Sequence, residues 1–157
     1  MSRVQLALNV SDLDAAVEFY RKLFGTEPAK IRPGYANFAV AQPPLKLVLI
    51  EGHGTPGTLN HLGVEVGSTD EVIAAQARLA AGGLATAVED EVTCCYAVQD
   101  KVWVDGPDAE PWEIYTVLAD AEMPAGQLRT AGPGSSDPVA CCSATPAAAA
   151  ASCCAAD

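Results

Sequence analysis

The chain has 157 residues, half of them apolar, and a formal net charge of −11 at pH 7. Nine Lys and Arg residues against 20 Asp and Glu residues argue against binding to nucleic acid or to an anionic membrane surface, because no basic patch is available. The sequence contains no apolar run of 18 residues and no charged-then-apolar leader after Met1. These features predict a soluble cytoplasmic protein, built as one domain or as two small modules that share a core.

The first third of the chain predicts one helix among four strands. Residues 4–10 have the composition of a buried strand, and Ser11 with the acids that follow it is typical of a helix start. Apolar residues then recur at helical spacing up to Phe24, and Gly25 follows as a stop. This segment therefore has the order β-α-β-β-β, with its later strands predicted at residues 29–32, 35–40 and 45–51.

The second half repeats this order. Gln5-Leu-Ala-Leu-Asn-Val10 returns 56 residues later as His61-Leu-Gly-Val-Glu-Val66, and Thr69-Asp70 opens a second helix. The fold class is therefore α+β, with two tandem βαβββ modules (about residues 1–52 and 58–118) that form a curved mixed sheet around an open metal cleft. We place this domain at residues 1–122. Residues 123–157 are rich in Ala, Gly, Ser and Pro and are predicted to be a disordered tail.

The repeat also places three potential metal ligands. Gln5 and His61 occupy matching positions early in the first strand of each module, and Glu113 lies in the last predicted strand. Aligning the two modules puts Lys46 where symmetry would place a fourth ligand, and a protonated lysine cannot bind a metal. Each residue alone is more often a core hydrogen-bonding group. Together, an amide, an imidazole and a carboxylate with open positions are related to the ligand set of non-haem Fe(II) enzymes.

All six cysteines occur as adjacent pairs. Neighbouring cysteines form a strained ring when bridged to each other, and the Cys-x-x-Cys spacing usual for zinc is absent. Two adjacent thiols instead chelate a soft ion or a trivalent arsenical. Cys94-Cys95 is expected on an acidic loop that opens with residues 89–91, whose carboxylates would raise the pKa of both thiols. Capture of arsenic and chance occurrence both stay open for the remaining pairs, Cys141-Cys142 and Cys153-Cys154.

Longer motifs extend over about residues 1–120. The most specific is Cys94-Cys-Tyr-Ala-Val-Gln-Asp-Lys-Val-Trp103, and others lie at residues 8–13, 22–30, 32–38, 44–51, 60–66 and 111–115. On these motifs the chain resembles the vicinal oxygen chelate superfamily, which includes glyoxalases, bleomycin-resistance proteins and extradiol dioxygenases. More narrowly, it resembles the branch of C–As lyases and cadmium-induced proteins.

The resemblance implies an Fe(II)- and O₂-dependent enzyme that cleaves the carbon–arsenic bond of trivalent organoarsenicals and releases arsenite. Methylarsenite and reduced aromatic arsenicals are the implied substrates. Gln5, His61 and Glu113 would hold the metal, while Cys94 and Cys95 would bind arsenic and take part in catalysis. The chain would be a monomer or a homodimer. Two other functions stay open: sequestration of Cd(II) or arsenicals without turnover, and a glyoxalase or antibiotic-binding role. A glyoxalase-type isomerase normally has a fourth carboxylate at the position that the alignment assigns to Lys46.

Overall fold

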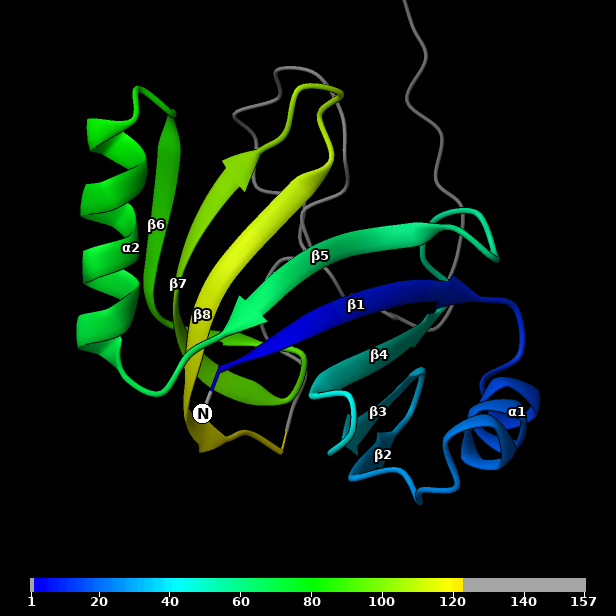
Figure 1. Ribbon diagram of the computed structural model, residues 1–157. Coiled ribbons are helices and arrows are strands. Elements are labelled where there is room, and N and C mark those ends of the chain that lie inside the picture. Colours follow the sequence, from blue (N-terminus) through cyan, green and yellow to red (C-terminus); the bar gives the residue numbers. More distant parts are fainter. Residues whose placement is uncertain (1, 123–157) are drawn as a thin grey trace, which may run out of the picture.

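The computed structural model describes residues 2–122, which form one eight-stranded sheet and two helices. The strand order in the sheet is β2-β3-β4-β1-β5-β8-β7-β6. The sheet curls into a half-barrel, and the helices cover its outer face at opposite ends (Figure 1). In chain order the elements are β1 (Arg3–Val10), α1 (Leu13–Phe24), β2 (Lys30–Arg32), β3 (Tyr35–Val40), β4 (Leu45–Glu51), β5 (Leu59–Glu65), α2 (Thr69–Ala81), β6 (Thr86–Cys94), β7 (Ala97–Asp105) and β8 (Pro111–Asp120).

The two predicted modules each contribute one half of the sheet. β1 pairs in parallel with β4, and β5 pairs in parallel with β8. The antiparallel pair of β1 with β5 joins the halves. The α+β class and the tandem βαβββ order are therefore confirmed. The predicted tail at residues 123–157 lies outside the described part of the chain.

The capping residue of each helix lies one position away from the one that the sequence suggested. Asp12, rather than Ser11, caps α1, and its Oδ1 accepts a hydrogen bond from the backbone N–H of Ala15 at 2.8 Å. Ser68, rather than Thr69, caps α2. In each case the cap is the extended residue directly before the first helical turn, from which a side-chain oxygen reaches the free N–H groups.

The acidic segment at residues 89–91 is part of strand β6 and not the loop that the sequence suggested. The strand continues to Cys94, and a register shift marks a bulge between Glu89 and Val92. Side chains across the pair with β7 hold this bulge. The N–H of Glu91 donates to Asp100 Oδ1 at 2.8 Å, and Trp103 Nε1 donates to Glu89 Oε2 at 3.1 Å. These cross-strand partners keep a charged segment within the sheet.

Alternation along β4 separates the core into an outer and an inner layer. Leu47 and Leu49 pack with α1 on the outer face. Val48 and Ile50 point to the concave side, in a buried cluster with Ala7, Tyr35 and Tyr96. Helix α2 covers the other half of the outer face, against β6, β7 and β8. The concave face thus stays free of helices, and no helix within residues 2–122 is long and apolar enough to cross a membrane.

Candidate metal and thiol site

The structure brings the three predicted metal ligands together on the concave face. Gln5 Nε2 lies 2.6 Å from Glu113 Oε1 and 3.1 Å from His61 Nε2, and the last two atoms are 3.4 Å apart. All three side chains are buried. Ligand atoms at right angles around an ion with bonds of about 2.1 Å lie roughly 3 Å from each other. The three end groups are therefore spaced as neighbouring ligands of one ion would be.

A glycine makes this convergence possible. Gly63 on β5 is the register partner of both Gln5 on β1 and Glu113 on β8. A Cβ at this position would lie 3.1 Å from Glu113 Cγ and 3.4 Å from Gln5 Cβ. The sequence analysis passed over this residue, although a glycine inside a strand pattern often marks a close approach of neighbouring groups.

Two asparagines fix the tautomer of His61. Asn60 Nδ2 donates to Asn9 Oδ1 at 2.9 Å, so Asn60 Oδ1 faces the imidazole and lies 2.8 Å from His61 Nδ1. Nδ1 therefore carries the hydrogen, and Nε2 presents a lone pair to the cluster. Asn9 is itself held by Thr58 at 3.0 Å. Such outer partners orient a metal-binding histidine, and neither asparagine was identified from the sequence.

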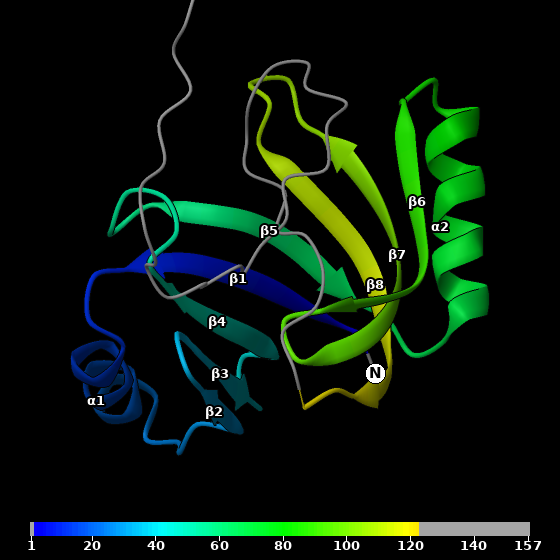
Figure 2. The same cartoon turned by 180° about the vertical axis from the view of Figure 1, so that it is seen from behind.

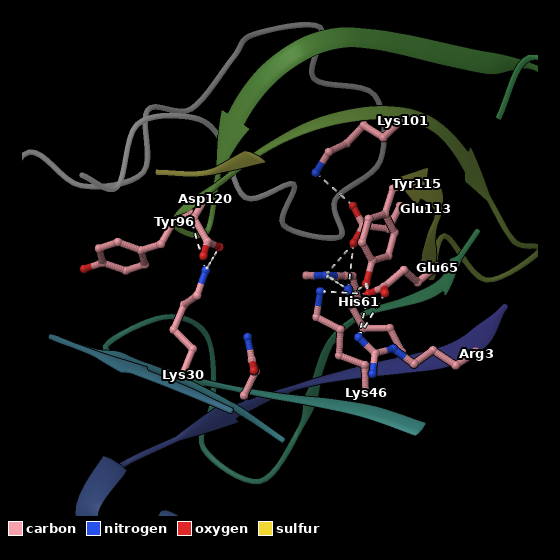
Figure 3. A network of polar contacts seen from close by, with 12 residues as sticks. Arg3, Lys30, Lys46, His61, Glu65, Tyr96, Lys101, Glu113, Tyr115 and Asp120 are labelled. Carbon is pink, nitrogen blue, oxygen red and sulfur yellow. Dashed lines mark hydrogen bonds and ion pairs between the residues drawn. The ribbon is translucent and has the colours of Figure 1, made fainter. Parts of the chain in front are cut away.

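Lys101 is a further member of the site that sequence reasoning missed. Its Nζ donates to Glu113 Oε2 at 2.9 Å, and the lysine is fully buried (Figure 3). Burial alone would raise the pKa of Glu113, but the Lys101 ammonium holds it well below its usual range. The carboxylate is therefore ionised, with Oε2 occupied by the lysine and Oε1 facing the ligand cluster. A lysine inside a predicted strand, followed by Val102 and Trp103, was the available signal.

The vicinal thiols lie at the tip of the β6–β7 hairpin. Cys94 Sγ and Cys95 Sγ are 3.3 Å apart, and neither sulfur is in a disulfide. Cys95 and Tyr96 have φ values of 54° and 62°, as in the tight hairpin turn that usually takes Asn and Gly. The tip reaches across to the first module (Figure 2), where Tyr96 Oη donates to the carbonyl oxygen of Pro33 at 3.2 Å. Lys30 binds the Tyr96 carbonyl oxygen at 3.2 Å. A strained turn, held from both modules, presents the two sulfurs.

The pKa values of the two thiols shift in opposite directions, whereas the sequence analysis expected both to rise. The hydrogen bond from Cys95 lowers the pKa of Cys94, and the nearby Lys101 ammonium adds to this effect against the opposing influence of burial. The same hydrogen bond, together with burial, raises the pKa of Cys95. Glu89 does raise the pKa of Cys94, as expected for a neighbouring carboxylate, but only as a minor contribution. The pair thus has one acidic thiol and one that keeps its proton.

The thiols and the ligand cluster line the same cavity. Gln5, His61 and Glu113 form one part of its wall, and Cys94 and Cys95 form another. Both groups of predicted site residues therefore face one space, whose free volume of about 10 Å³ has room for about one water molecule. A larger ligand would need the wall of this cavity to move.

No fourth ligand stands at the position related by symmetry to Glu113. Glu113 lies opposite Gly63 in the second module, and Val48 lies opposite Ala7, the residue that corresponds to Gly63 in the first. Val48, and not the predicted Lys46, is therefore the counterpart of Glu113. Lys46 instead donates to Glu65 Oε2 at 3.0 Å. Within residues 2–122, no three His, Cys, Asp or Glu residues form a metal-binding group. A metal site here would therefore need the Gln5 amide as its third ligand.

The donor set suits a divalent ion after one adjustment. His61 Nε2 has a free lone pair, and Glu113 Oε1 is ionised. Gln5, however, turns Nε2 towards both of these atoms, and an amide binds a metal through its oxygen. Rotation of the Gln5 amide by half a turn exchanges Oε1 and Nε2, so that Oε1 becomes the third metal ligand beside His61 Nε2 and Glu113 Oε1.

Comparison with known proteins shows the class of the protein. A family model described as the Glyoxalase/Bleomycin resistance protein/Dioxygenase superfamily matches residues 3–114, and the chain belongs to this superfamily. The chain is 61% identical over 142 residues to the cadmium-induced protein CadI of Mycobacterium tuberculosis, covering 90% of this chain and 93% of CadI. It is 59% identical over 144 residues to the trivalent organoarsenical cleaving enzyme of Thermomonospora curvata, covering 91% of this chain and 89% of that enzyme. The predicted resemblance is confirmed.

Solved structures share the fold. The Mn(II)-bound glyoxalase from Novosphingobium aromaticivorans superposes with a TM-score of 0.55 at 19% identity, over 81% of this chain and 47% of that protein. An extradiol ring-cleaving dioxygenase from B. fuscum gives a TM-score of 0.55 at 18% identity, over 80% of this chain and 39% of the dioxygenase. At these identities the likeness concerns the curled sheet and its two modules.

Proposed function

We propose that the protein cleaves the carbon–arsenic bond of trivalent organoarsenicals such as methylarsenite and reduced aromatic arsenicals, using Fe(II) and O₂, and releases arsenite. The observation that carries this proposal is the shared cavity, in which a vicinal thiol pair faces an amide–imidazole–carboxylate cluster. The relative at 59% identity that is named a trivalent organoarsenical cleaving enzyme supports the same reaction.

The thiols bind the arsenical first. The Cys94 thiolate attacks arsenic and displaces one hydroxide, which leaves as water with the proton that Cys94 gave up. The Cys95 thiol then displaces the second hydroxyl and supplies the proton for the second water. The balance is R–As(OH)₂ plus two thiols to R–As(S-Cys)₂ plus two waters. This tether places the organic group in a fixed position beside the ligand cluster, which replaces a two-body encounter by an intramolecular one.

His61 Nε2, Glu113 Oε1 and the amide oxygen of Gln5 would hold Fe(II). When bound, this ion supplies the binding and activation of O₂. Lys101 keeps Glu113 to a single free oxygen, so positions around the ion stay open. For methylarsenite the atoms balance as CH₃As(OH)₂ plus O₂ to As(OH)₃ plus formaldehyde. Because the thiols need a reducing compartment to remain reduced, we place this reaction in the cytoplasm.

A second function is sequestration of Cd(II) or of an arsenical without turnover. The 61% identical relative is named for its induction by cadmium. The thiol pair alone could chelate either Cd(II) or an arsenical. A glyoxalase-type isomerase function receives less support, because Val48 occupies the position where a fourth carboxylate ligand would stand.

Product analysis separates these functions. Protein loaded with Fe(II) under nitrogen is mixed with methylarsenite, and one half is exposed to air. The enzyme releases arsenite and formaldehyde in equal amounts, with equal O₂ uptake, only in the aerated half. Bound arsenic without O₂ uptake in either half would show sequestration.

A further inference from the structure

The hydroxyl of Tyr115 faces more hydrogen-bond acceptors than it has hydrogens. Its Oη lies 2.5 Å from Gln5 Oε1 and 2.9 Å from Glu65 Oε2, and a phenol carries a single hydrogen. A phenol has an ordinary pKa of about 10, so the hydroxyl retains this hydrogen at pH 7. One of the two contacts therefore lacks a hydrogen as long as Gln5 turns its oxygen towards Tyr115.

The Gln5 amide shows the complementary mismatch at the ligand cluster. Its Nε2 donates to Glu113 Oε1 and faces the lone pair of His61, which suits a cluster without an ion. A cation at this place needs the amide oxygen instead. The two ends of an amide have nearly the same size, so rotation by half a turn needs no rearrangement of the neighbouring strands. It brings Oε1 into the cluster and turns Nε2 towards Tyr115.

We infer that Tyr115 is a positioning residue that holds the Gln5 amide in its metal-binding orientation. After the rotation, Gln5 Nε2 donates to Tyr115 Oη, and the Tyr115 hydrogen goes to Glu65 Oε2, so both contacts of the tyrosine are satisfied. Glu65 is fixed as the acceptor by Arg3 at 2.9 Å and Lys46 at 3.0 Å (Figure 3). This inference rests on the metal site of the proposed function and adds the contact that makes a glutamine suitable as its ligand.

In the rotated state Tyr115→Phe removes two hydrogen bonds, one from the Gln5 N–H and one to Glu65, whereas in the observed orientation the single tyrosine hydrogen makes only one. A buried N–H without a partner is tolerated less often than a buried C=O. We expect metal affinity to fall about 10-fold, the lower end of the range for outer partners of a metal ligand, because Tyr115 acts only through Gln5. In a Gln5→Glu background both ends of the side chain are oxygens, and the tyrosine makes the same contact with and without metal. The same substitution should then change affinity less than about threefold, because only differential contacts shift an equilibrium.

The test measures the Kd of Mn(II) for the full chain without arsenical, by electron paramagnetic resonance of the free ion. Tyr35→Phe is the matched control, because Tyr35 is also buried on the concave side, but its hydroxyl accepts from Asn37 Nδ2 at 2.9 Å. A loss confined to Tyr115→Phe with Gln5 present supports the inference. Unchanged affinity, or an equal loss in the Gln5→Glu background, overturns it. Wild-type protein that binds no Mn(II) overturns both the inference and the metal site, whereas tight binding without arsenite release counts against the proposed function alone.

Discussion

The two modules have the same order of strands and helix but bring different chemistry to the cleft between them. The second module supplies His61, Glu113, Lys101 and both thiols of the hairpin. The first supplies one amide, Gln5, together with Tyr35, Lys46 and the apolar Val48. Duplication of a module thus explains the shape of the cleft, while the reactive groups are concentrated in one copy. The following predictions test this asymmetry, beginning with the largest expected effect.

The thiols should dominate turnover. We expect Cys94→Ser and Cys95→Ser each to reduce arsenite release by at least about 100-fold, because a single sulfur cannot form the two-point tether and effective molarity is lost. Arsenite is measured in air with Fe(II)-loaded protein. A variant with Ser at Cys141, Cys142, Cys153 and Cys154 serves as control and should keep its turnover at saturating arsenical. Full activity in both single variants would exclude the tether.

The two lysines of the cleft should differ in their effect on stability. Lys101→Met leaves the buried Glu113 carboxylate without its cation and should cost about 3–5 kcal/mol in the free energy of unfolding. Lys46→Met should cost about 1 kcal/mol or less, because Glu65 keeps Arg3 and Tyr115 as partners. Denaturant unfolding at pH 7 measures both. Equal costs would contradict the proposed asymmetry.

The Lys101 effect should also depend on pH. The folded-state pKa of Glu113 is held below its ordinary value, so the stability it contributes is present above about pH 4.3 and is lost as pH falls further. The difference in the free energy of unfolding between the wild-type protein and Lys101→Met should therefore become smaller below that pH.

Much of this arrangement was accessible from the sequence, because the 56-residue repeat gave the modules and paired Gln5 with His61. What escaped prediction depends on contacts between strands. The partners of Lys101 follow from the register of β7 with β8, which composition does not reveal. The acidic bulge of β6 looked like a loop because its partners lie on another strand: Glu89 accepts from Trp103, and the Glu91 N–H donates to Asp100. The correspondence of Val48 with Glu113 likewise follows from the strand register, whereas alignment of the two sequences had matched Lys46 with Glu113.

The ligands from the two modules should contribute unequally to metal affinity. His61→Ala should weaken Mn(II) binding at least about 100-fold, since outer partners alone contribute 10–100-fold. Gln5→Ala should weaken it about 10-fold, because an amide oxygen carries no charge and water can replace it. Both values come from titration of the protein in the absence of arsenical. A larger loss for Gln5→Ala than for His61→Ala would reverse the assignment of the second module as the stronger half.

The thiols should titrate in two separate steps. With the four cysteines beyond residue 122 replaced by Ser, ultraviolet thiolate absorbance should show a first step below the ordinary thiol pKa of about 8.5 and a second above it. Lys101→Met should move the first step to higher pH, because it removes the nearby ammonium. A single step for both sulfurs would show that the hairpin does not distinguish them.

The smallest effect is expected where the modules meet. Gly63→Ala places a methyl group 3.1 Å from Glu113 Cγ and 3.4 Å from Gln5 Cβ, so both ligands must shift by a few tenths of an ångström. We expect Mn(II) affinity to fall a few-fold and stability by about 1–3 kcal/mol, as for a crowded core. Gly67→Ala is the control, since its new Cβ would meet only the Glu71 side chain, at 3.7 Å or more. If Gly63→Ala and Gly67→Ala bind Mn(II) with the same affinity, the site tolerates a small shift of the first module relative to the second. The close approach of β1, β5 and β8 would then not set the geometry of the ligands.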